Sequence, residues 1–550
     1  MKNAEIADIL YEIADFLEIQ EVEYKPRAYR KAARNVESLS EDVEAVHERG
    51  ELEDIEGVGE SIADKIAEYL ETGEMTYYRE LKADLPIDIE AITSVEGVGP
   101  KTAKKLYREL GVATFDDLEA AAEAGQIAEV EGFGEKSQQN ILDHLDMAKA
   151  GQERMLLGRA FPIAGDVQSR LSADEAFARV DIVGSFRRRR ATVGDIDVLA
   201  SATDPDAATE AFCGHDDVKE VLSRGETKSS VVVSGDLRMD LRLVADEEYG
   251  AALVYFTGSK DHNIALRNRA IDRDWKLNEY GLFDVADVDE AEEGQRIGEL
   301  VASETEEAVY DALDLEFIPP ELREDTGEVE AAAAGELPDL VAVEDVRGDL
   351  QCHTEYSDGS ASVREMAEAA AERGHEYLLV TDHGPGAPIP SKLDEEGFEA
   401  QRADVEAVNE DGDVDVTVLQ GIEAEIVDGG LEVPEDWLEA CDLVVAGLHG
   451  TPDDPTDEVC RVLEEYPVDV LAHPTNRLLN QREPLDLDVG AVVAAAASND
   501  VALEINAQPE RLDLDWQYVK EYRDDVPLVV STDAHTTGEL DFLHLGVAQA

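Results

Sequence analysis

Residues 184–199 read GSFRRRRATVGDIDVL, and this stretch decides how the middle of the chain is interpreted. In a strand, Asp195 and Asp197 project to one face, while the apolar residues beside them project to the other, because side chains alternate. Two carboxylates on an open face can bridge two divalent ions about 3.5–4 Å apart. A D-x-D pair alone is common in so acidic a chain, so it gains weight only from its surroundings.

The surroundings strengthen the interpretation. Residues 237–243, LRMDLRL, predict a second strand with Asp240 on its polar face. Three carboxylates on neighbouring strands suit Mg²⁺, which prefers oxygen ligands and keeps waters and substrate phosphates. Upstream, Gly184 and Ser185 offer a close backbone approach and a hydroxyl, and the arginines at 187–190 can pair with a triphosphate.

An apolar-x-Gly-x-Gly sequence recurs at 55–59, 95–99 and 130–134, each time before an amphipathic helical stretch. This is helix–hairpin–helix spacing: the glycines permit a tight turn with positive φ, and the next helix presents free N–H groups to a phosphate. One copy would equally describe a plain helix–helix turn, whereas three in order indicate DNA binding. The glycines concerned are Gly57, Gly59, Gly97, Gly99, Gly132 and Gly134.

The 550 residues include 47 Lys and Arg against 128 Asp and Glu, a formal charge of −81, which read alone excludes a polyanionic partner. The acid is spread along a chain that is 43% hydrophobic, so it is not a disordered tail. We expect the protein to work in a cell interior of molar salt, where a Debye length of about 3 Å screens the repulsion between its carboxylates. Two basic segments contain no acidic residue: 25–34, which includes Tyr29 and Lys31, and 101–108. In so acidic a chain they predict contact with DNA; the alternative is a solvated helix face.

Other classes are excluded. No apolar run approaches the roughly 18 residues of a membrane span, and the acidic amphipathic N-terminus is unlike a signal peptide. Four scattered cysteines form no C-x-x-C pair, which argues against a disulfide framework or zinc finger. We expect a cytoplasmic monomer with no membrane partner.

After residues 319–343, which begin Pro319-Pro320 and are typical of a linker, strand-like runs alternate with helical segments. This alternation predicts a parallel barrel with its sites at the strand C-termini. The runs are 377–381, 416–419, 442–446, 468–472, 501–505 and 527–531.

Seven of the eleven histidines follow residue 343, and several end or follow the expected strands together with carboxylates. A lone histidine is usually a packed residue, but this many at strand ends predict a metal centre for Zn²⁺, Mn²⁺ or Fe²⁺, with a shared Glu bridging two ions. The positions are His353, Asp358, His383, Glu423, His449, His473, Asp533 and His535. His375 and His544 match no motif and are expected to be structural.

The first half resembles the family X DNA polymerases of prokaryotes, with an archaeal, halophile-like composition. The matching segments are GSFRR…GDIDVL, LRMDLRLV, YFTGSKDHNIALR and LNEYGLF, and the hairpins with YKPRAYRKAA resemble that family's N-terminal and fingers domains. The resemblance implies that Asp195 and Asp197 hold two Mg²⁺ or Mn²⁺ ions and that Asp240 helps activate the primer 3′-hydroxyl. The implied nucleotide contacts are Gly184, Ser185, Arg188 and Gly194 at the phosphates, Tyr255, Phe256 and Gly258 at the sugar, and Asn263 and Arg267 at the nascent base pair. Lys260, Asp261 and His262 differ from the best-known animal members, which leaves base selection open.

Lys65 lies eight residues after Gly57, where resembling proteins with lyase activity carry a Schiff-base lysine. Ser61 stands where those lyases have another lysine, and Asp64 adjoins Lys65, so we expect the protonated, unreactive amine to be favoured. A structural or phosphate-binding lysine is the alternative.

The second half resembles the polymerase-and-histidinol-phosphatase (PHP) domain, a distorted barrel with a trinuclear site that can act as a 3′–5′ exonuclease and phosphoesterase. The resemblance makes the eight strand-end residues ligands for up to three Zn²⁺ or Mn²⁺ ions. Gln351 stands where the family opens H-x-H, and its neutral amide is expected to loosen one metal. The chain stops at LHLGVAQA, where a closing helix begins, and we expect a truncation there.

We therefore expect a multidomain α and α/β protein: a gap-filling DNA repair polymerase that acts on primer–template or gapped DNA and dNTPs. One alternative is a nucleotidyltransferase that does not act on DNA, fused to a phosphatase; the hairpin motifs and the YFTGS segment argue against it. Another is a binding or scaffold protein that has lost its catalytic sites; the intact carboxylates argue against that. The expected domains are 1–80 (N-terminal helical, DNA-binding), 81–148 (helix–hairpin–helix, fingers-like), 149–248 (nucleotidyltransferase palm), 249–318 (thumb-like, nucleotide-selecting), 319–343 (linker) and 344–550 (PHP).

Overall fold

The computed structural model forms two compact units, one of Glu153–Leu340 and one that combines Met1–Gln152 with Val341–Ala550. Among the described helices, none combines the length and apolar character needed to cross a membrane. The structure describes residues 2–19, 22, 25–37, 43–55, 57–73, 75–84, 87, 92, 95, 98–130, 132–139, 141–142, 154–215, 217–233, 237–288 and 295–550.

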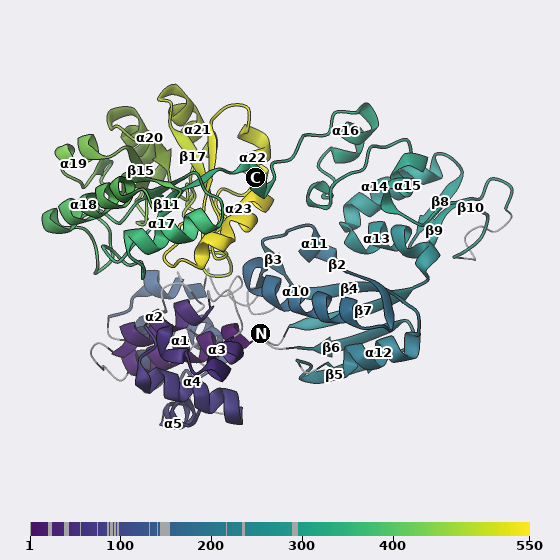
Figure 1. Ribbon diagram of the computed structural model, residues 1–550, viewed down its shortest axis with the longest axis horizontal. Helices are drawn as coiled ribbons and strands as arrows, with labels where there is room; N and C mark the ends of the chain where they lie inside the picture. The colour runs from purple at the N-terminus through teal and green to yellow at the C-terminus, as the bar shows by residue number, and fades with distance from the viewer. Residues whose placement is uncertain are drawn as a thin grey trace. The chain divides into compact units, whose positions relative to one another are not determined.

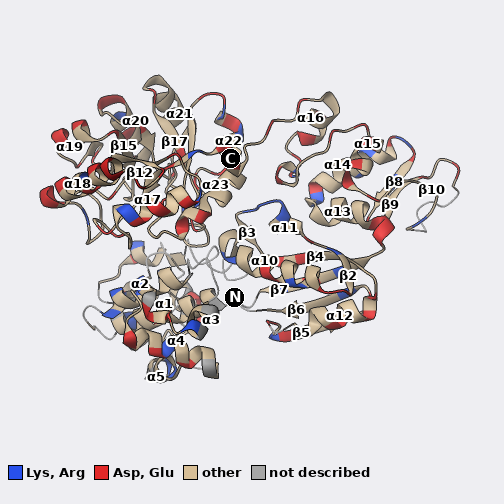
Figure 2. Cartoon of the chain, viewed as in Figure 1, with Lys and Arg blue, Asp and Glu red and all other residues tan. Residues whose placement is uncertain are grey.

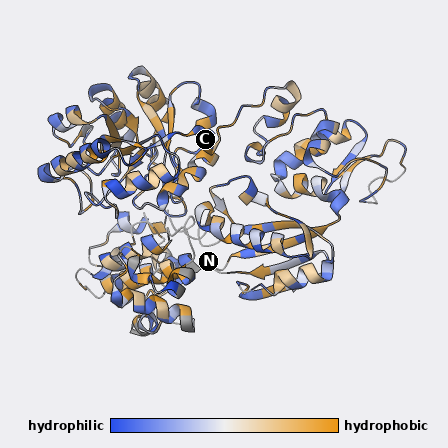
Figure 3. Cartoon of the chain, in the orientation of Figure 1, coloured by the Kyte–Doolittle hydropathy of each residue, from blue (hydrophilic) through white to orange (hydrophobic). Residues whose placement is uncertain are grey.

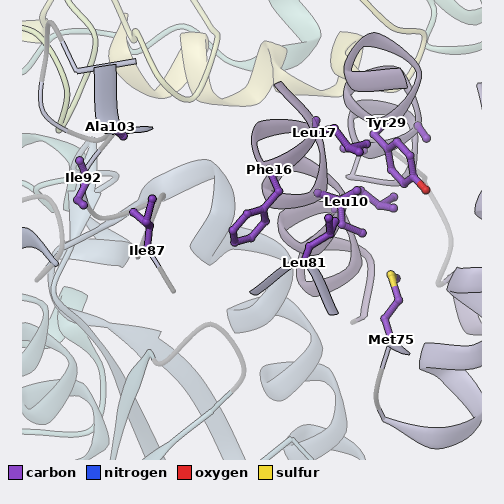
Figure 4. Packing of buried hydrophobic residues seen from close by; sticks show 14 of the residues in the cluster. Leu10, Phe16, Leu17, Tyr29, Met75, Leu81, Ile87, Ile92 and Ala103 are labelled. Carbon is purple, nitrogen blue, oxygen red and sulfur yellow. The ribbon is translucent and has the colours of Figure 1, made fainter. Parts of the chain in front are cut away.

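The N-terminal part is helical (Figure 1). Within α2, Tyr29, Ala32, Ala33 and Val36 recur at helical spacing and are buried, so one face of this basic helix faces the core. Figure 4 shows Leu10, Leu17 and Tyr29 close together in this core. The elements are α1 Lys2–Ile19, α2 Lys25–Glu37, α3 Val43–Arg49, η1 Leu52–Asp54, α4 Glu60–Thr72, α5 Thr76–Asp84, α7 Pro100–Leu110, α8 Phe115–Glu123 and η2 Ile127–Glu129.

The second unit begins with a five-stranded sheet in the order β2-β4-β7-β6-β5. The strands expected at 195–197 and at 237–243 are present as β4 and β7, and each carries a buried apolar row. The exposed strand β5 was not expected. The elements are β1 Met155–Leu156, α10 Leu157–Ala173, β2 Phe177–Val183, α11 Gly184–Arg187, β3 Thr192–Val193, β4 Asp195–Ala202, α12 Pro205–Cys213, β5 Glu220–Arg224, β6 Lys228–Val232 and β7 Arg238–Val244.

A second subdomain of this unit packs helices on a three-stranded sheet, and residues 319–340 belong to it. Of the expected linker 319–343, residues 319–340 lie in this unit, where Val329 and Ala332 join the core around Tyr310 and Arg323 is fully buried. The elements are η4 Asp246–Glu248, α13 Tyr249–Thr257, α14 Lys260–Ile271, β8 Trp275–Asn278, β9 Gly281–Asp284, β10 Glu299–Ala302, α15 Glu306–Ala312, η5 Pro320–Leu322 and α16 Glu328–Ala334.

The C-terminal part is a nearly closed barrel of parallel strands, as expected, in the order β11-β12-β13-β15-β16-β17-β18. A parallel bridge joins Cys352 of the first strand to Ala534, three residues after the end of the last strand. Figure 2 shows acidic residues along the covering helices, and Figure 3 shows hydrophilic and hydrophobic residues mixed along them.

The barrel strands are β11 Gly348–Cys352, β12 Tyr377–Val380, β13 Thr417–Val427, β15 Leu443–Gly447, β16 Val470–Leu471, β17 Ala502–Asn506 and β18 Leu528–Ser531, with β14 Gly430–Leu431 paired to β13. The helices are η6 Val343–Asp345, α17 Val363–Glu372, α18 Glu395–Asp411, α19 Glu435–Ala440, α20 Pro455–Glu465, α21 Val489–Ser498, α22 Trp516–Tyr522, η7 Glu539–Phe542 and α23 Leu543–Gln549.

Candidate metal centres

The first centre lies on two adjacent parallel strands. Asp195 and Asp197 come from β4, and the register places Asp197 opposite Asp240 of β7. One oxygen from each of the three carboxylates lies within 4.8 Å of the others. The alternate residues Ile196 and Val198 are fully buried, so strand periodicity alone sends the carboxylates to one face.

Gly184 is required by this centre. Its φ is +69°, and a Cβ there would lie 2.6 Å from Oδ2 of Asp197. Any side chain would therefore both strain the backbone and displace this carboxylate oxygen. The glycine that opens GSFRR thus belongs to the carboxylate centre as well as to the turn.

The centre carries excess negative charge. Burial raises the pKa of Asp197 to about 6, and the charges of Asp195 and Asp240 add to the effect. Burial also acts on Asp240, but hydrogen bonds from Arg238 and Lys228 outweigh it and hold its pKa below the usual range. Clustered carboxylates with this repulsion fit divalent cations, which would relieve it.

Most of the residues expected at the nucleotide lie on or next to α11, α13 and α14, which are linked by hydrogen bonds. Arg188, which follows α11, donates from Nη1 to the carbonyl oxygen of Thr257 at 2.5 Å. Asn263 donates to the carbonyl oxygen of Tyr255 at 2.7 Å, and Arg267 donates to that of Asn263 at 3.2 Å. The remaining expected residues are Ser185 on α11, Gly194 directly before β4, Phe256 on α13 and Gly258 at its end.

The second centre lies at the carboxyl ends of the barrel strands. Three groups of potential ligand atoms, each within 4.8 Å, are found there among the described residues. His473 lies outside these groups but places Nε2 3.1 Å from Oε1 of Glu423. The groups are His353–Asp358–His383–His535, His383–Glu423–His449 and His353–Glu423–Asp533. The structure therefore brings together all eight strand-end residues.

The polar atoms of this centre fit metal ions. The Nδ1 atoms of His353 and His473 are buried and have no hydrogen-bond partner among the described residues. Burial lowers the pKa values of His383 and His473 to about 4, so both imidazoles are neutral at pH 7, the form that binds metal. His473 and Asp533 have φ values of +28° and +53°, sparsely populated conformations that their surroundings must hold.

Two functional residues escaped the sequence analysis. Glu425, two residues after Glu423 on β13, accepts a hydrogen bond from His449 Nδ1 at 2.6 Å and fixes that ring. Arg511 places Nε 3.9 Å from Oδ2 of Asp533. The E-x-E spacing was a readable signal for Glu425, whereas the loop carrying Arg511 gave none.

Gln351, which stands where the resembling PHP family has a histidine, lies in this centre. Its Nε2 is 3.4 Å from Oδ1 of Asp533, and its Oε1 is buried without a hydrogen-bond partner among the described residues. Gln351 therefore borders the group formed by His353, Glu423 and Asp533, the metal position that its amide is expected to weaken.

The hairpin glycines divide into two kinds. Gly57 and Gly132 have positive φ values, 74° and 87°. Gly59 and Gly99 are extended N-caps of α4 and α7 that provide no side-chain cap, and α7 begins with Pro100, which has no N–H to donate. Gly134 directly precedes a helical segment at 135–139, and Gly97 lies outside the described residues.

The two N-terminal residues expected to contact DNA, Tyr29 and Lys31, lie in different surroundings. The Tyr29 ring is only 6% exposed and stacks on Tyr77, so it lies in the core rather than on a DNA-facing surface. Lys31 packs its stem against the first hairpin, since a Cβ on Gly57 would lie 2.9 Å from its Cγ.

Lys65 donates to the carbonyl and hydroxyl oxygens of Ser61 at 2.6 and 2.9 Å. Burial lowers the pKa of Lys65 and outweighs the raising effect of Asp64, the opposite of the expected balance. The lyase activity stays a prediction.

Family models match four parts of the chain. The helix-hairpin-helix domain matches residues 1–75, and the SAM-like helix-hairpin-helix tandem matches residues 89–147. The DNA polymerase beta thumb matches residues 252–324, and the PHP domain matches residues 349–548.

Curated proteins match the whole chain or parts of it. It is 33% identical over 559 residues to the DNA polymerase/3′-5′ exonuclease PolX of Bacillus subtilis, covering all of this chain and 95% of that protein. DNA polymerase lambda of Rattus norvegicus is 25% identical over 344 residues, 58% of this chain and 56% of that protein. A probable phosphatase of Acetivibrio thermocellus is 35% identical over 170 residues, 29% of this chain and 64% of that protein.

Proposed function

Because this chain belongs to the family X DNA polymerases that carry a C-terminal PHP domain, we propose that its two centres perform separate reactions on DNA. Asp195, Asp197 and Asp240 would serve template-directed nucleotide addition, and the barrel centre would serve 3′–5′ exonuclease and phosphoesterase cleavage. The observation that carries the first assignment is the register that sets Asp197 against Asp240, with an oxygen of Asp195 within 4.8 Å of an oxygen of each.

In the polymerase centre, Asp195 and Asp197 would hold two Mg²⁺ or Mn²⁺ ions, and these ions would stabilise the charge of the transferred phosphoryl group. Asp240 is suited to accept the proton of the primer 3′-hydroxyl, because Lys228 and Arg238 keep its carboxylate ionised. Arg188, held by the Thr257 carbonyl oxygen, binds the triphosphate.

In the barrel centre, Glu423 supports the assignment, because its two oxygens face different imidazoles and would be shared between metal sites. Zn²⁺ or Mn²⁺ ions, up to three, would supply an activated water for phosphodiester cleavage. Arg511 brings a guanidinium to this carboxylate-rich centre and is suited to neutralise the scissile phosphate.

The partners are primer–template or gapped DNA and dNTPs, which points to gap filling in DNA repair. The uncapped helix ends at Gly59 and Gly99 would receive DNA phosphates. We place the protein in the cytoplasm as a monomer, in an organism whose interior holds molar salt, since its charge of −81 requires strong screening.

Primer extension and primer digestion in molar KCl test this function. With dNTPs and Mg²⁺, a single-nucleotide gap should be filled; without dNTPs and with Mn²⁺, the labelled 3′ end should be shortened. Failure of extension in every metal and salt condition, with digestion retained, would contradict the polymerase assignment.

Replacing Gln351 with histidine should strengthen metal binding at the second centre. Imidazole is a stronger ligand than a neutral amide, so Gln351→His should raise the metal content toward three ions per chain and the exonuclease turnover about 10-fold or more, the scale on which residues that support metal ligands change affinity or activity. Elemental analysis and digestion assays on both proteins measure this. Three tightly held ions and equal turnover in the unsubstituted protein would show that Gln351 ligates adequately.

DNA binding should depend weakly on salt. If backbone N–H groups of the hairpins make much of the contact, few cations are displaced, and the slope of log K against log [KCl] should be shallow. Fluorescence anisotropy over a KCl series measures the slope. A slope steeper than about −5, equivalent to about six neutralised phosphates, would contradict this expectation.

A further inference from the structure

Residues 323–328, REDTGE, bind the nucleotide-site residues of their own unit; we call this segment the strap. The carbonyl oxygen of Arg323 accepts the N–H of Ser259 at 2.9 Å, at the turn that begins α14. Glu324 accepts Nε of Arg188 at 2.7 Å. Glu328 lies 2.6 Å from Nδ1 of His262. The strap thus reaches both the arginine expected at the triphosphate and the helix expected at the base pair.

His262 is the buried anchor of that helix. Its side chain is fully buried on α14, next to Asn263 and one turn before Leu266. Nδ1 faces Glu328, and Nε2 lies 3.0 Å from the Tyr310 hydroxyl. Because both ring nitrogens are engaged from the core side, the rotation of α14 about its axis is fixed at this point.

Glu328 is held as firmly as His262. It is 4% exposed, and it also accepts the backbone N–H groups of Asp325 and Thr326 at 2.9 and 2.7 Å. Burial would raise the pKa of Glu328, but the hydrogen bond from His262 and these N–H groups lower it, so the carboxylate is ionised. Burial also lowers the pKa of His262, which leaves a neutral ring that donates from Nδ1 to Glu328 and accepts from Tyr310.

The strap also fixes the direction of Arg188. With Nε on Glu324 and Nη1 on the Thr257 carbonyl oxygen, the guanidinium keeps one orientation before any nucleotide binds. The Nε atom of Arg190 lies 3.3 Å from the same Glu324 oxygen, so this carboxylate balances two neighbouring cations. A guanidinium fixed in advance loses less conformational entropy on binding a phosphate.

We infer that the strap is a working part of the nucleotide site, with Glu328 acting through His262, and Glu324 acting through Arg188, as positioning residues for nucleotide addition. This inference rests on the proposed roles of Arg188, Asn263 and Arg267. It explains why residues with a linker-like composition are buried. It also gives a role to His262, a position at which this sequence differs from the best-known animal members of the family.

The test compares Glu328→Ala with Glu330→Ala in the full-length chain. Glu330 is an exposed carboxylate two residues further along the same helix, so it controls for lost charge. In Glu328→Ala, kcat/KM for the correct dNTP should fall about 10- to 100-fold, the cost of misplacing a reacting group by about 1 Å, and discrimination against a mismatched dNTP should fall with it. KM for primer–template and exonuclease turnover should stay unchanged, as neither uses α14.

Glu328→Gln separates positioning from mere stability, since its amide keeps one acceptor oxygen and should recover part of the lost kcat/KM. If Glu328→Ala does not fold, Glu324→Ala tests the other arm, because Glu324 is partly exposed and should raise KM for dNTP without lowering the melting temperature. The inference is overturned if these variants match Glu330→Ala in dNTP KM and discrimination.

Arg188→Ala and Asn263→Ala, assayed in parallel, separate this inference from the proposed function. If neither changes KM for dNTP or discrimination, the proposed nucleotide site is wrong and the strap loses its role with it. If both do and the strap variants do not, the strap inference alone fails.

Discussion

Asp197→Asn should abolish nucleotide addition and leave exonuclease turnover unchanged. The substitution removes a charged metal ligand at the point where β4 and β7 face each other, while keeping the shape of the side chain. Losses at such sites amount to several kcal/mol of transition-state stabilisation, so extension should fall about 1,000-fold or more. Single-nucleotide gap filling, with exonuclease digestion on the same preparation, measures both effects.

The same variant should be no less stable than the unsubstituted protein. Burial and the neighbouring carboxylates raise the pKa of Asp197 to about 6, so above this pH the folded state holds a charge that the unfolded state solvates better. Without metal at pH 7.5, Asp197→Asn should therefore melt at a higher temperature, and the gain should shrink as pH falls below about 6 and vanish near pH 3.8, the ordinary pKa of the carboxyl. Asp206→Asn, an exposed position on α12, is the matched control. Near-normal extension by Asp197→Asn would contradict the assignment.

Both centres could be predicted from the sequence, because the positions of their residues follow from the alternation of side chains along a strand and from the places where strands end. Asp195 and Asp197 alternate with buried Ile196 and Val198, and this pattern alone sends both carboxylates to one face. The barrel ligands follow from a different rule, since parallel strands end at one rim of the barrel and their terminal residues converge there.

The parts that escaped prediction are stabilised by contacts that composition does not reveal. The strap contains Arg323 and Glu328, residue types that are almost never fully buried unless paired, and their partners Glu306 and His262 lie 17 and 66 residues away. Strand β5 has five exposed residues and no apolar row, so it is held by pairing with β6 rather than by burial. Such pairings depend on tertiary geometry, which local pattern does not encode.

The barrel centre makes a second large effect testable, because Glu423 is shared by two of its ligand groups. Oε1 lies 3.1 Å from His473 Nε2, and Oε2 lies 3.1 Å from His383 Nδ1. A Cβ on Gly447 would approach Oε1 within 2.4 Å, so this residue must be glycine for the carboxylate to occupy its place. The local geometry is thus arranged around one side chain, and its charge should matter more than that of any single imidazole.

Glu423→Gln should therefore reduce exonuclease turnover about 1,000-fold or more and lower the metal content, while extension stays unchanged. A glutamine keeps the shape but offers one neutral oxygen, so two metal positions lose the charge that balances them. Elemental analysis after gel filtration, digestion of a labelled primer without dNTPs, and gap filling on the same sample give the three readouts. Glu465→Gln, exposed at the end of α20, controls for lost charge on this acidic barrel. Unchanged metal content with full turnover would show that the imidazoles and Asp533 suffice, whereas loss of metal together with extension would show that the two centres are not independent.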